Sequence, residues 1–288
     1  MKPNRFAYHD PTTIDECVAL LSEHGDEAKP LAGGQSLVPL MNLRLAAPSV
    51  LVDLNGVAGL ADVRDEGDTL AIGAMTRHRT VATDAVVGGA NPLLAHAASK
   101  IGYPAIRVRG TIGGSLSHAD PVSEFPCVAM ALGAELVIAG PDGRRTVPAS
   151  EFFCGYFTTA MQPGELLVEV RFPHVGGATG WGFHELERKA GDYAVVAVAA
   201  AVTVHDGTIS SARIGLAGVA DRPVTAAAAA EGMCGQPATA ESVAAAAAAI
   251  SEQAAAGGMR DAPFVSHVAG VLGRRALTDA LERAGSPT

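Results

Sequence analysis

Leu31-Ala-Gly-Gly-Gln-Ser-Leu37 is the stretch around which the chain is organised. It follows Glu27-Ala-Lys-Pro30, which predicts the entry to a buried strand, and precedes Val38-Pro-Leu-Met-Asn-Leu-Arg-Leu45, which predicts a helix with its apolar face inward. A strand, a pair of glycines and a helix in that order place backbone N–H groups around an anion. The stretch therefore predicts a turn that binds phosphate.

The residues of this turn suit that role. Gly33 and Gly34 have no Cβ, so the main chain can approach a phosphate closely and adopt a positive φ. Ser36 is expected to cap the following helix, and Pro39 is tolerated in its first turn. The spacing is neither Gly-x-Gly-x-x-Gly nor Gly-x-x-x-x-Gly-Lys-Ser/Thr, so it supports neither a Rossmann nicotinamide site nor a nucleoside triphosphatase. An ordinary glycine turn without a ligand is the alternative.

A second segment of the same kind is Arg107-Val-Arg-Gly-Thr-Ile-Gly-Gly-Ser-Leu-Ser-His-Ala-Asp-Pro121. It again sets a glycine pair beside small hydroxyl side chains. Two such loops can hold a diphosphate from two sides through neutral donors. The pair of loops therefore favours a ligand with a diphosphate over one with a single phosphate.

Composition limits the class of protein. A chain of 288 residues, 48% of them hydrophobic, is long enough for two compact domains with real cores. A net charge of −9 without a basic run disfavours nucleic acid and anionic membranes as partners. The start of the sequence lacks the apolar core of a signal peptide, and the longest apolar run, Tyr193 to Val204, is shorter than the about 20 residues that span a bilayer. We expect no membrane span and a cytoplasmic location.

The four cysteines lie far apart, and none belongs to a Cys-x-x-Cys pair. These spacings disfavour a zinc site, an iron–sulfur cluster or a disulfide framework. We expect all four to be reduced and packed as small apolar residues. They are Cys17, Cys127, Cys154 and Cys234.

The periodicity of apolar residues, together with glycine and proline punctuation, predicts a mixed α+β chain. Helices are expected at residues 13–24, 80–87, 92–101, 122–132, 226–233, 240–255 and 265–284. Strands are expected at residues 50–55, 60–64, 69–73, 135–139, 145–147, 165–172, 181–186, 195–204 and 211–218. The turn residues at 65–68 and 141–143 predict hairpins between the strands on either side of them. Gly176 and Gly177 mark the expected boundary between two domains.

The two glycine motifs together resemble a known family. Ala32-Gly-Gly-Gln-Ser36 with Thr111-Ile-Gly-Gly-Ser115 is similar to the paired FAD motifs of the flavoprotein subunits of molybdenum hydroxylases. This is the family of the carbon monoxide dehydrogenase medium subunit and the xanthine dehydrogenase flavin domain. The resemblance runs from Phe6 to the last helix, and both motifs match in order and separation.

The resemblance implies an α+β fold with two domains. Residues 1–175 would form an FAD-binding domain of the vanillyl-alcohol-oxidase (PCMH) type, built from subdomains 1–56 and 57–175. Residues 178–286 would form a C-terminal domain of the carbon monoxide dehydrogenase flavoprotein type, with a three-stranded antiparallel sheet and helices.

The resemblance also implies which residues bind FAD, without a covalent bond to the flavin. No catalytic residue and no metal ligand is expected in this chain. The implied FAD-binding residues are Leu31, Ala32, Gly33, Gly34, Gln35, Ser36, Leu37, Thr111, Ile112, Gly113, Gly114, Ser115, Asp120, Glu124, Leu167, Lys189 and Tyr193.

Four of these residues have an expected role of their own. Glu124 suits ribityl or ribose hydroxyls, because an ionised carboxylate only accepts hydrogen bonds; the alternative is a solvated acid that stabilises a helix start. Leu167 would abut the flavin or serve as a plain core residue. Tyr193 would lie by the flavin ring and Lys189 would stabilise charge on the reduced flavin. For His118, Arg107 and Arg109 the sequence leaves the role open.

The implied function is electron transfer within a complex. A large molybdopterin subunit would oxidise the substrate, a small subunit with [2Fe–2S] clusters would pass the electrons on, and this chain would deliver them to NAD, a quinone or a cytochrome. The expected assembly is a dimer of heterotrimers, a heterohexamer. A self-contained flavin oxidase and a non-catalytic assembly subunit are the alternatives. The organic or gaseous substrate is not encoded in this chain.

Overall fold

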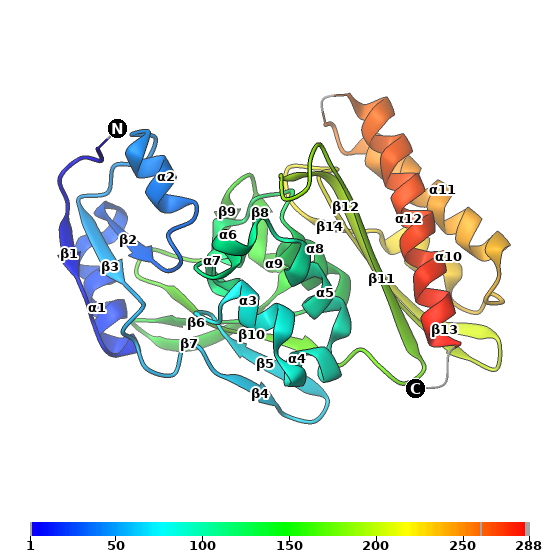
Figure 1. Cartoon of the computed structure of the whole chain (residues 1–288), viewed down its shortest axis with the longest axis horizontal. Helices are drawn as coiled ribbons and strands as arrows, with labels where there is room; N and C mark the ends of the chain where they lie inside the picture. Colours follow the sequence, from blue (N-terminus) through cyan, green and yellow to red (C-terminus); the bar gives the residue numbers. More distant parts are fainter. Residues whose placement is uncertain (1, 260, 286–288) are drawn as a thin grey trace.

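The structure, a computed structural model, describes residues 2–259 and 261–285. Three sheets follow one another along the long axis of the molecule, from the N-terminal strands to the C-terminal helices (Figure 1). The predicted end of the second domain, residue 286, lies outside the described residues. In the described part of the chain, no helix combines the length and the apolar composition needed to cross a bilayer.

The N-terminal unit is a parallel three-stranded sheet in the order β1-β3-β2, formed by Ala7–His9, Val50–Asp53 and Ala28–Leu31. Helix α1 (Ile14–His24) begins at a capping box between Thr13 and Glu16, as the sequence predicts near residue 13. A short 3-10 helix, η1 (Gly25–Glu27), connects α1 to β2. Helix α2 (Leu37–Asn42) follows the first glycine turn.

The central unit is an antiparallel five-stranded sheet in the order β4-β5-β10-β6-β7. The predicted hairpins at residues 65–68 and 141–143 are confirmed by the pairing of β4 with β5 and of β6 with β7. The strands are β4 (Val63–Asp65), β5 (Thr69–Gly73), β6 (Glu135–Gly140), β7 (Gly143–Pro148) and β10 (Leu166–Pro173). A small two-stranded sheet adds β8 (Phe153–Gly155) and β9 (Thr158–Thr159).

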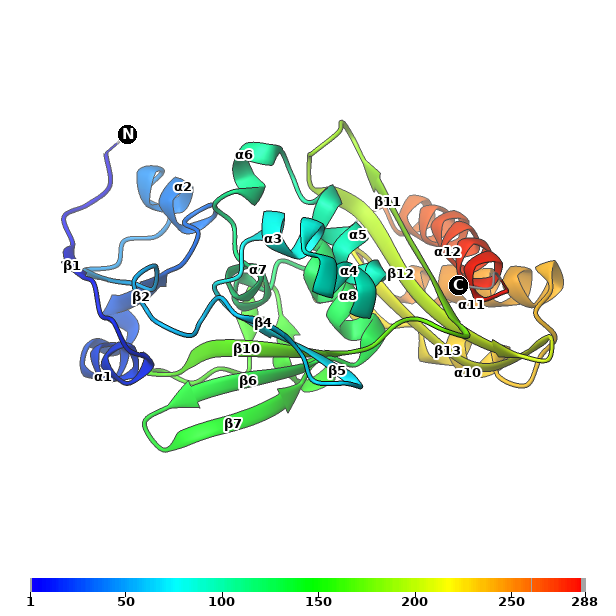
Figure 2. The same ribbon diagram turned by 60° about the horizontal axis from the view of Figure 1, so that its bottom comes forward.

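Helices cover one face of the central sheet, as Figure 2 shows after a turn of the molecule. They are α3 (His78–Thr83), α4 (Ala85–Ala90), α5 (Pro92–Lys100), α6 (Pro104–Arg107), α7 (Ile112–His118), α8 (Glu124–Leu132) and α9 (Ala149–Phe152). The single helix expected at residues 80–87 is wrong, because Asp84 ends α3 and caps α4 through its side chain.

The C-terminal unit corrects one prediction. Its antiparallel sheet has four strands in the order β11-β12-β13-β14, not three, because the chain after Pro223 pairs with β13 before it turns helical. The strands are Thr179–Glu187, Ala194–His205, Thr208–Ala217 and Val224–Thr225. The helices are α10 (Ala227–Met233), α11 (Ala240–Ala256) and α12 (Ala262–Ala284).

Strand β12 belongs to two cores at once. Ala197, Ala199 and Ala201 join the core shared with α5 and α8, whereas Val196 and Val198 join the core beneath α11 and α12. This alternation is the period of a strand that is buried on both faces. The C-terminal sheet is therefore sandwiched between the central helices and its own helices, which fixes the position of the loop between β11 and β12.

Two other predictions fail at the surface. Helix α2 is shorter than expected and buries only Met41, while Leu45 beyond its end is 73% exposed. Arg44 adopts a positive φ directly after this helix, so the predicted inward apolar face does not form. β2 buries only Ala28, because it is an edge strand.

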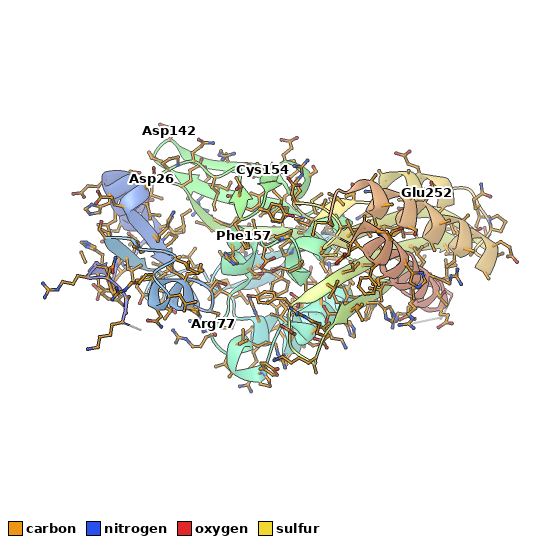
Figure 3. All side chains as sticks on the ribbon, turned by 90° about the horizontal axis from the view of Figure 1, so that it is seen from above. Asp26, Arg77, Asp142, Cys154, Phe157 and Glu252 are labelled. Carbon is orange, nitrogen blue, oxygen red and sulfur yellow. The ribbon has the colours of Figure 1, made fainter. Side chains whose placement is uncertain are left out.

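Only two of the four cysteines are packed as predicted. Cys17 and Cys127 are buried, but Cys154, in the short strand β8, and Cys234, at the end of α10, are exposed. Figure 3 shows Cys154 beside the central hairpins. All four are free thiols.

Candidate functional site

A cavity of about 430 Å³ lies where the three units meet. Its size is within the range of cofactor pockets. The first glycine turn, the start of α7, the start of α8 and the loop between β11 and β12 all contribute to its wall. Of the residues implied by the family resemblance, the cavity is lined by Ala32, Gly33, Gly34, Gln35, Ser36, Leu37, Thr111, Gly113, Gly114, Ser115, Glu124, Leu167 and Tyr193.

The first glycine turn presents unused donors to this cavity. Within the described residues, the backbone N–H groups of residues 33–37 have no hydrogen-bond partner, whereas the next one, of Val38, donates to the Gly34 carbonyl at 3.1 Å. Gly34 has a φ of +72°, which turns successive N–H groups toward one concave surface. Gly33 is buried, and a buried backbone donor without a protein partner is rare, so the donors of this turn suit an anionic ligand.

Ser36 stands at the start of α2, but it does not cap that helix as predicted. Its backbone is already helical, which keeps its hydroxyl away from the N–H groups that follow. The Ser36 side chain instead faces Tyr193 from the opposite side of the cavity and acts to lower the pKa of that phenol.

The second glycine segment is not a loop. Its residues form α7, with Thr111 as N-cap, and its donors are used by the protein itself. Ile112 N–H donates to Thr76 O, Gly113 N–H to Ala74 O, and Gly114 N–H to Thr111 Oγ1. The expectation that both segments hold a diphosphate through neutral donors stays a prediction. Because these N–H groups are already bonded within the protein, the donors left for a ligand in the second segment are its hydroxyl side chains.

The first glycine turn contacts the second, which consists of residues 107–111 and the start of α7. Close packing explains one glycine in each turn. A Cβ on Gly33 would lie 2.4 Å from Arg109 O, and a Cβ on Gly113 would lie 2.4 Å from Ala74 Cβ. Real side chains do not approach so closely. Gly33 thus allows the two turns to pack, and Gly113 allows α7 to pack on the segment after β5; neither missing Cβ faces the cavity.

Glu124 is buried, so the alternative of a solvated acid at a helix start is wrong. Only 8% of the residue is exposed, and it lines the cavity at the first turn of α8. Burial raises the pKa of Glu124 to about 8, and the charges of Glu185 and Asp120 act in the same direction against a hydrogen bond from its own backbone. At neutral pH this side chain is a neutral acid, which both donates and accepts hydrogen bonds.

Tyr193 reaches the cavity from the C-terminal unit. The loop before it is held by Glu187, whose carboxylate accepts a hydrogen bond from the Gly191 N–H at 2.8 Å. Burial against the cavity and the charges of Asp120 and Glu124 raise the pKa of Tyr193. A residue of the third sheet therefore closes a cavity that the first two sheets build.

Several predicted residues do not line the cavity. Leu31 belongs to β2, and Ile112 is fully buried behind α7. Asp120 accepts from the Val122 N–H and so shapes the turn between α7 and α8. Lys189 lies exposed on the loop before Tyr193. Among these four, only Asp120 acts on the cavity, through its charge.

The structure assigns contacts to residues whose role the sequence left open. His118 lines the cavity and stacks on Phe157, with ring centroids 5.0 Å apart, and burial lowers its pKa. Arg107 donates to the carbonyls of Ile101 and Gly102 at the end of α5, so it does not face a phosphate.

His78 is the main residue that sequence reasoning missed. It is buried, lines the cavity, and its Nε2 donates to Thr111 O at 2.9 Å, which leaves Nδ1 without a protein partner among the described residues. Burial lowers the pKa of His78 to about 4, so the ring is neutral at neutral pH. The run of polar residues Thr76-Arg-His78, two residues after the buried strand β5, is the signal that could have indicated it.

Residues 4–175 match the family described as the FAD binding domain in molybdopterin dehydrogenase, and residues 181–280 match the CO dehydrogenase flavoprotein C-terminal domain. The chain belongs to the family of FAD-binding medium subunits of molybdopterin dehydrogenases. Similar medium subunits include the carbon monoxide dehydrogenase medium chain of Hydrogenophaga pseudoflava, 41% identical over 98% of this chain and 99% of the relative. The 6-hydroxypseudooxynicotine dehydrogenase complex subunit alpha of Paenarthrobacter nicotinovorans is 44% identical over 76% of this chain and 74% of the relative.

Solved structures of such medium subunits have the same fold. The carbon monoxide dehydrogenase of Hydrogenophaga pseudoflava that lacks the Mo-pyranopterin moiety superposes with a TM-score of 0.93 at 41% identity, over 98% of this chain and 99% of the other. Quinoline 2-oxidoreductase from Pseudomonas putida 86 superposes with a TM-score of 0.91 at 34% identity, over 99% of this chain and 100% of the other. Medium subunits that serve different dehydrogenases therefore share this chain's architecture.

Proposed function

We propose that this chain binds one FAD without a covalent bond, in the cavity between the two glycine turns, and transfers electrons within a molybdenum hydroxylase complex. The main support is the first turn, whose N–H groups at residues 33–37 line the cavity and have no partner in the part of the chain that the structure describes. A diphosphate supplies the acceptors that such a concave set of donors binds. When bound, FAD supplies a carrier for two electrons.

The other wall residues suit the remainder of an FAD molecule. Ser115 and Glu124 offer hydrogen-bonding side chains to ribityl and ribose hydroxyls, and Leu167 offers an apolar surface. Tyr193 and the loop before it cover the opening and limit the access of water. Leu31, Ile112 and Asp120 support these walls from behind, and Lys189 lies on the covering loop, where a positive charge would stabilise a reduced flavin.

The substrate is oxidised elsewhere in the complex. We infer that a molybdopterin large subunit and a small subunit with [2Fe–2S] clusters are the partners, in a dimer of heterotrimers, and that this chain passes their electrons to an external acceptor. Relatives named for carbon monoxide, caffeine and nicotine show that medium subunits of this family serve chemically different substrates. We further infer a cytoplasmic complex and a division of the chain into domains 1–175, with subdomains 1–56 and 57–175, and 178–286.

The identity of the cofactor has a direct test. The purified chain is heated or acidified, and the released nucleotide is identified by chromatography. FAD, released in full, is the expected result, because the cavity holds a diphosphate site. Recovery of FMN, or flavin that stays attached to the protein, would contradict the proposal.

The division of labour has a second test, made by following the visible flavin absorbance under anaerobic conditions. Dithionite is expected to bleach the flavin of the isolated chain, and an organic substrate offered alone is not. Addition of the iron–sulfur and molybdenum subunits is expected to make the substrate bleach it. Rapid bleaching by substrate in the isolated chain would identify a self-contained oxidase instead.

A further inference from the structure

We propose that Asn55 and Arg77 are positioning residues that lock the two glycine turns together and so set the width of the diphosphate site. The two side chains form one continuous path of hydrogen bonds from the carbonyl of Ala32 in the first turn to the carbonyl of Arg109 before the second. This inference rests on the proposed function, because it concerns the cavity assigned to FAD.

The path has a defined direction. Asn55 Nδ2 donates to Ala32 O at 3.1 Å and also to the carboxylate of Asp53. Asn55 Oδ1 accepts from Arg77 Nη2 at 2.6 Å, and Arg77 Nη1 donates to Arg109 O. A guanidinium only donates and a carbonyl only accepts, so a flipped Asn55 amide would break its hydrogen bonds to Ala32 and to Arg77 at once.

The path joins two separate sheets. Asn55 follows β3, the strand that pairs with β2, and β2 leads into the first turn. Arg77 immediately precedes α3, in the segment after β5 whose carbonyls accept from the second turn. Figure 3 shows Arg77 at the junction between the N-terminal unit and the central unit. Each residue therefore belongs to the rigid support of one turn and reaches across to the other.

The contact between the two glycine turns leaves little free space. Gly33 lies against Arg109 and Gly110, and the side chain of Ala32 faces Gly114. Without the path, these apolar and backbone contacts alone would set the separation of the turns. The donors of residues 33–37 and the hydroxyl side chains of the second turn would then no longer face one diphosphate at a fixed distance.

Asp53 holds the amide of Asn55 in place. Its carboxylate accepts from the Tyr8 hydroxyl and from the Asn55 backbone N–H, at 3.0 Å for the latter. Burial raises the pKa of Asp53, but the hydrogen bonds from Tyr8 and Asn55 outweigh this and leave it below its ordinary value. The carboxylate stays ionised at neutral pH, so it orients the Asn55 side chain toward both turns.

The test compares Arg77→Met with Arg79→Met in the full chain. Arg79 lies two residues further along α3, is exposed, and its side chain makes no hydrogen bond or ion pair among the described residues, so both variants lose the same charge near the same place. FAD affinity is measured by flavin titration, and the melting temperature of the FAD-free chain is measured in parallel. We expect Arg77→Met to weaken FAD binding about tenfold or more and Arg79→Met to leave it within about twofold.

Two further variants separate positioning from general support. Asn55→Ala is expected to weaken FAD binding as Arg77→Met does, and the double variant to be no worse than either, because both break one path. Arg77→Lys is expected to restore part of the affinity, since its single nitrogen reaches one acceptor but not both. Additive losses, or a lowered melting temperature with unchanged FAD affinity, would overturn the proposal.

A readout without FAD keeps the two proposals distinguishable. In the FAD-free chain, Arg77→Met is expected to speed hydrogen exchange at Val38 and Leu40, whose N–H groups donate to the first turn. If the unaltered chain binds no FAD, the proposed function fails but this exchange still tests the lock. If the unaltered chain binds FAD, and Arg77→Met matches Arg79→Met in both affinity and exchange, the lock is wrong and the proposed function stands.

Discussion

The two glycine turns look alike in sequence but differ in how their backbone N–H groups are used. In the first, the N–H groups of residues 33–37 have no partner among the described residues, while in the second the N–H groups of residues 112–115 are bound to Thr76, Ala74 and Thr111. The N–H groups of the first turn can therefore bind a ligand, whereas those of the second turn are already bonded to other residues of the protein. Changes in the second turn should therefore act mainly on stability, and changes in the first mainly on FAD affinity.

The largest effect is expected from Gly113→Ala in the second turn. The added Cβ would lie 2.4 Å from Ala74 Cβ and 2.7 Å from Ala74 O, so the backbone must move. We expect a loss of about 3 kcal/mol in the free energy of unfolding and a melting temperature lower by about 6 °C or more, measured by thermal melting without FAD.

Gly88→Ala is the matched control for Gly113→Ala. Gly88 lies within α4, and nothing would be within 4 Å of its Cβ. The same exchange there is expected to leave stability unchanged or to raise it by about 0.5 kcal/mol, since alanine favours a helix. Equal stability of the two variants would show that α7 does not depend on close packing at Gly113.

The next effect is a dependence of stability on pH, and it comes from Glu124 at the start of α8. The pKa of Glu124 is raised to about 8 from an ordinary value of 4.5. Between these values the folded chain holds a proton that the unfolded chain has lost, so the contribution of Glu124 to stability is complete below 4.5 and is lost as pH rises through 8. The slope is at most about 1.4 kcal/mol per pH unit.

Urea denaturation at pH 6.5 and at pH 8 measures this contribution. His78, which titrates near its ordinary value only in the unfolded chain, and Glu185, whose pKa is raised to about 7 in the folded chain, also change stability in this window. Both are present in the unaltered chain and in the variant, so the comparison of the two proteins isolates Glu124. The unaltered chain is expected to lose up to about 2 kcal/mol more between the two pH values than Glu124→Gln, which cannot titrate. The same pH dependence in both would mean that Glu124 is ionised throughout.

A smaller effect is expected from Gly34→Ala in the first turn. Gly34 has a φ of +72°, and an alanine Cβ would lie 3.2 Å from the Val38 side chain. The left-handed backbone would be strained by about 1 kcal/mol, and relief of that strain would turn the donors of residues 33–37 out of line. We expect about tenfold weaker FAD binding, measured by flavin titration.

Gly59→Ala controls for the strain itself. Gly59 has a φ of +74°, open space around its Cβ, and no place in the wall of the cavity. It is expected to lower stability as Gly34→Ala does and to leave FAD affinity unchanged. Equal affinity for FAD in the two variants would show that the first turn is not the diphosphate site.

The sequence predicted most of this architecture but not the difference between the turns. Helices α8 and α11, the hairpins and the family were all recognisable, because periodicity and turn residues are local signals. The partners of the N–H groups at residues 112–114 are carbonyls of Ala74 and Thr76 and the Thr111 hydroxyl. A pairing between segments that lie far apart in sequence leaves no pattern in either one.

The burial of Glu124 and His78 was hidden for the same reason. Glu124 follows a serine and His78 stands between two arginines, sequence surroundings that are typical of the surface, and only the packing of α3, α7 and α8 removes both from water. The short fourth strand, β14, was missed because a two-residue strand has no period to detect. Lys189 was carried over from the family, but its loop leaves it exposed.

The smallest effect tests what the Ser36 hydroxyl does in the first turn. It faces Tyr193, a residue 62% exposed at the opening of the cavity, and acts on the pKa of that phenol as a hydrogen-bond partner does. If that pairing persists when FAD is bound, Ser36→Ala and Tyr193→Phe each remove one end of the same hydrogen bond. Each is expected to weaken FAD binding about two- to threefold, as a solvent-exposed hydrogen bond does.

The double variant then decides between two partners for Ser36. A shared hydrogen bond can be lost only once, so Ser36→Ala with Tyr193→Phe is expected to bind FAD as weakly as either single variant. If the Ser36 hydroxyl instead joins the N–H groups of residues 33–37 on the diphosphate, the two losses multiply, to about four- to ninefold. Multiplied losses would assign Ser36 to the ligand and leave Tyr193 to act through its ring. If the double variant loses no more FAD affinity than either single variant, Ser36 is the residue through which the C-terminal unit contacts the first turn.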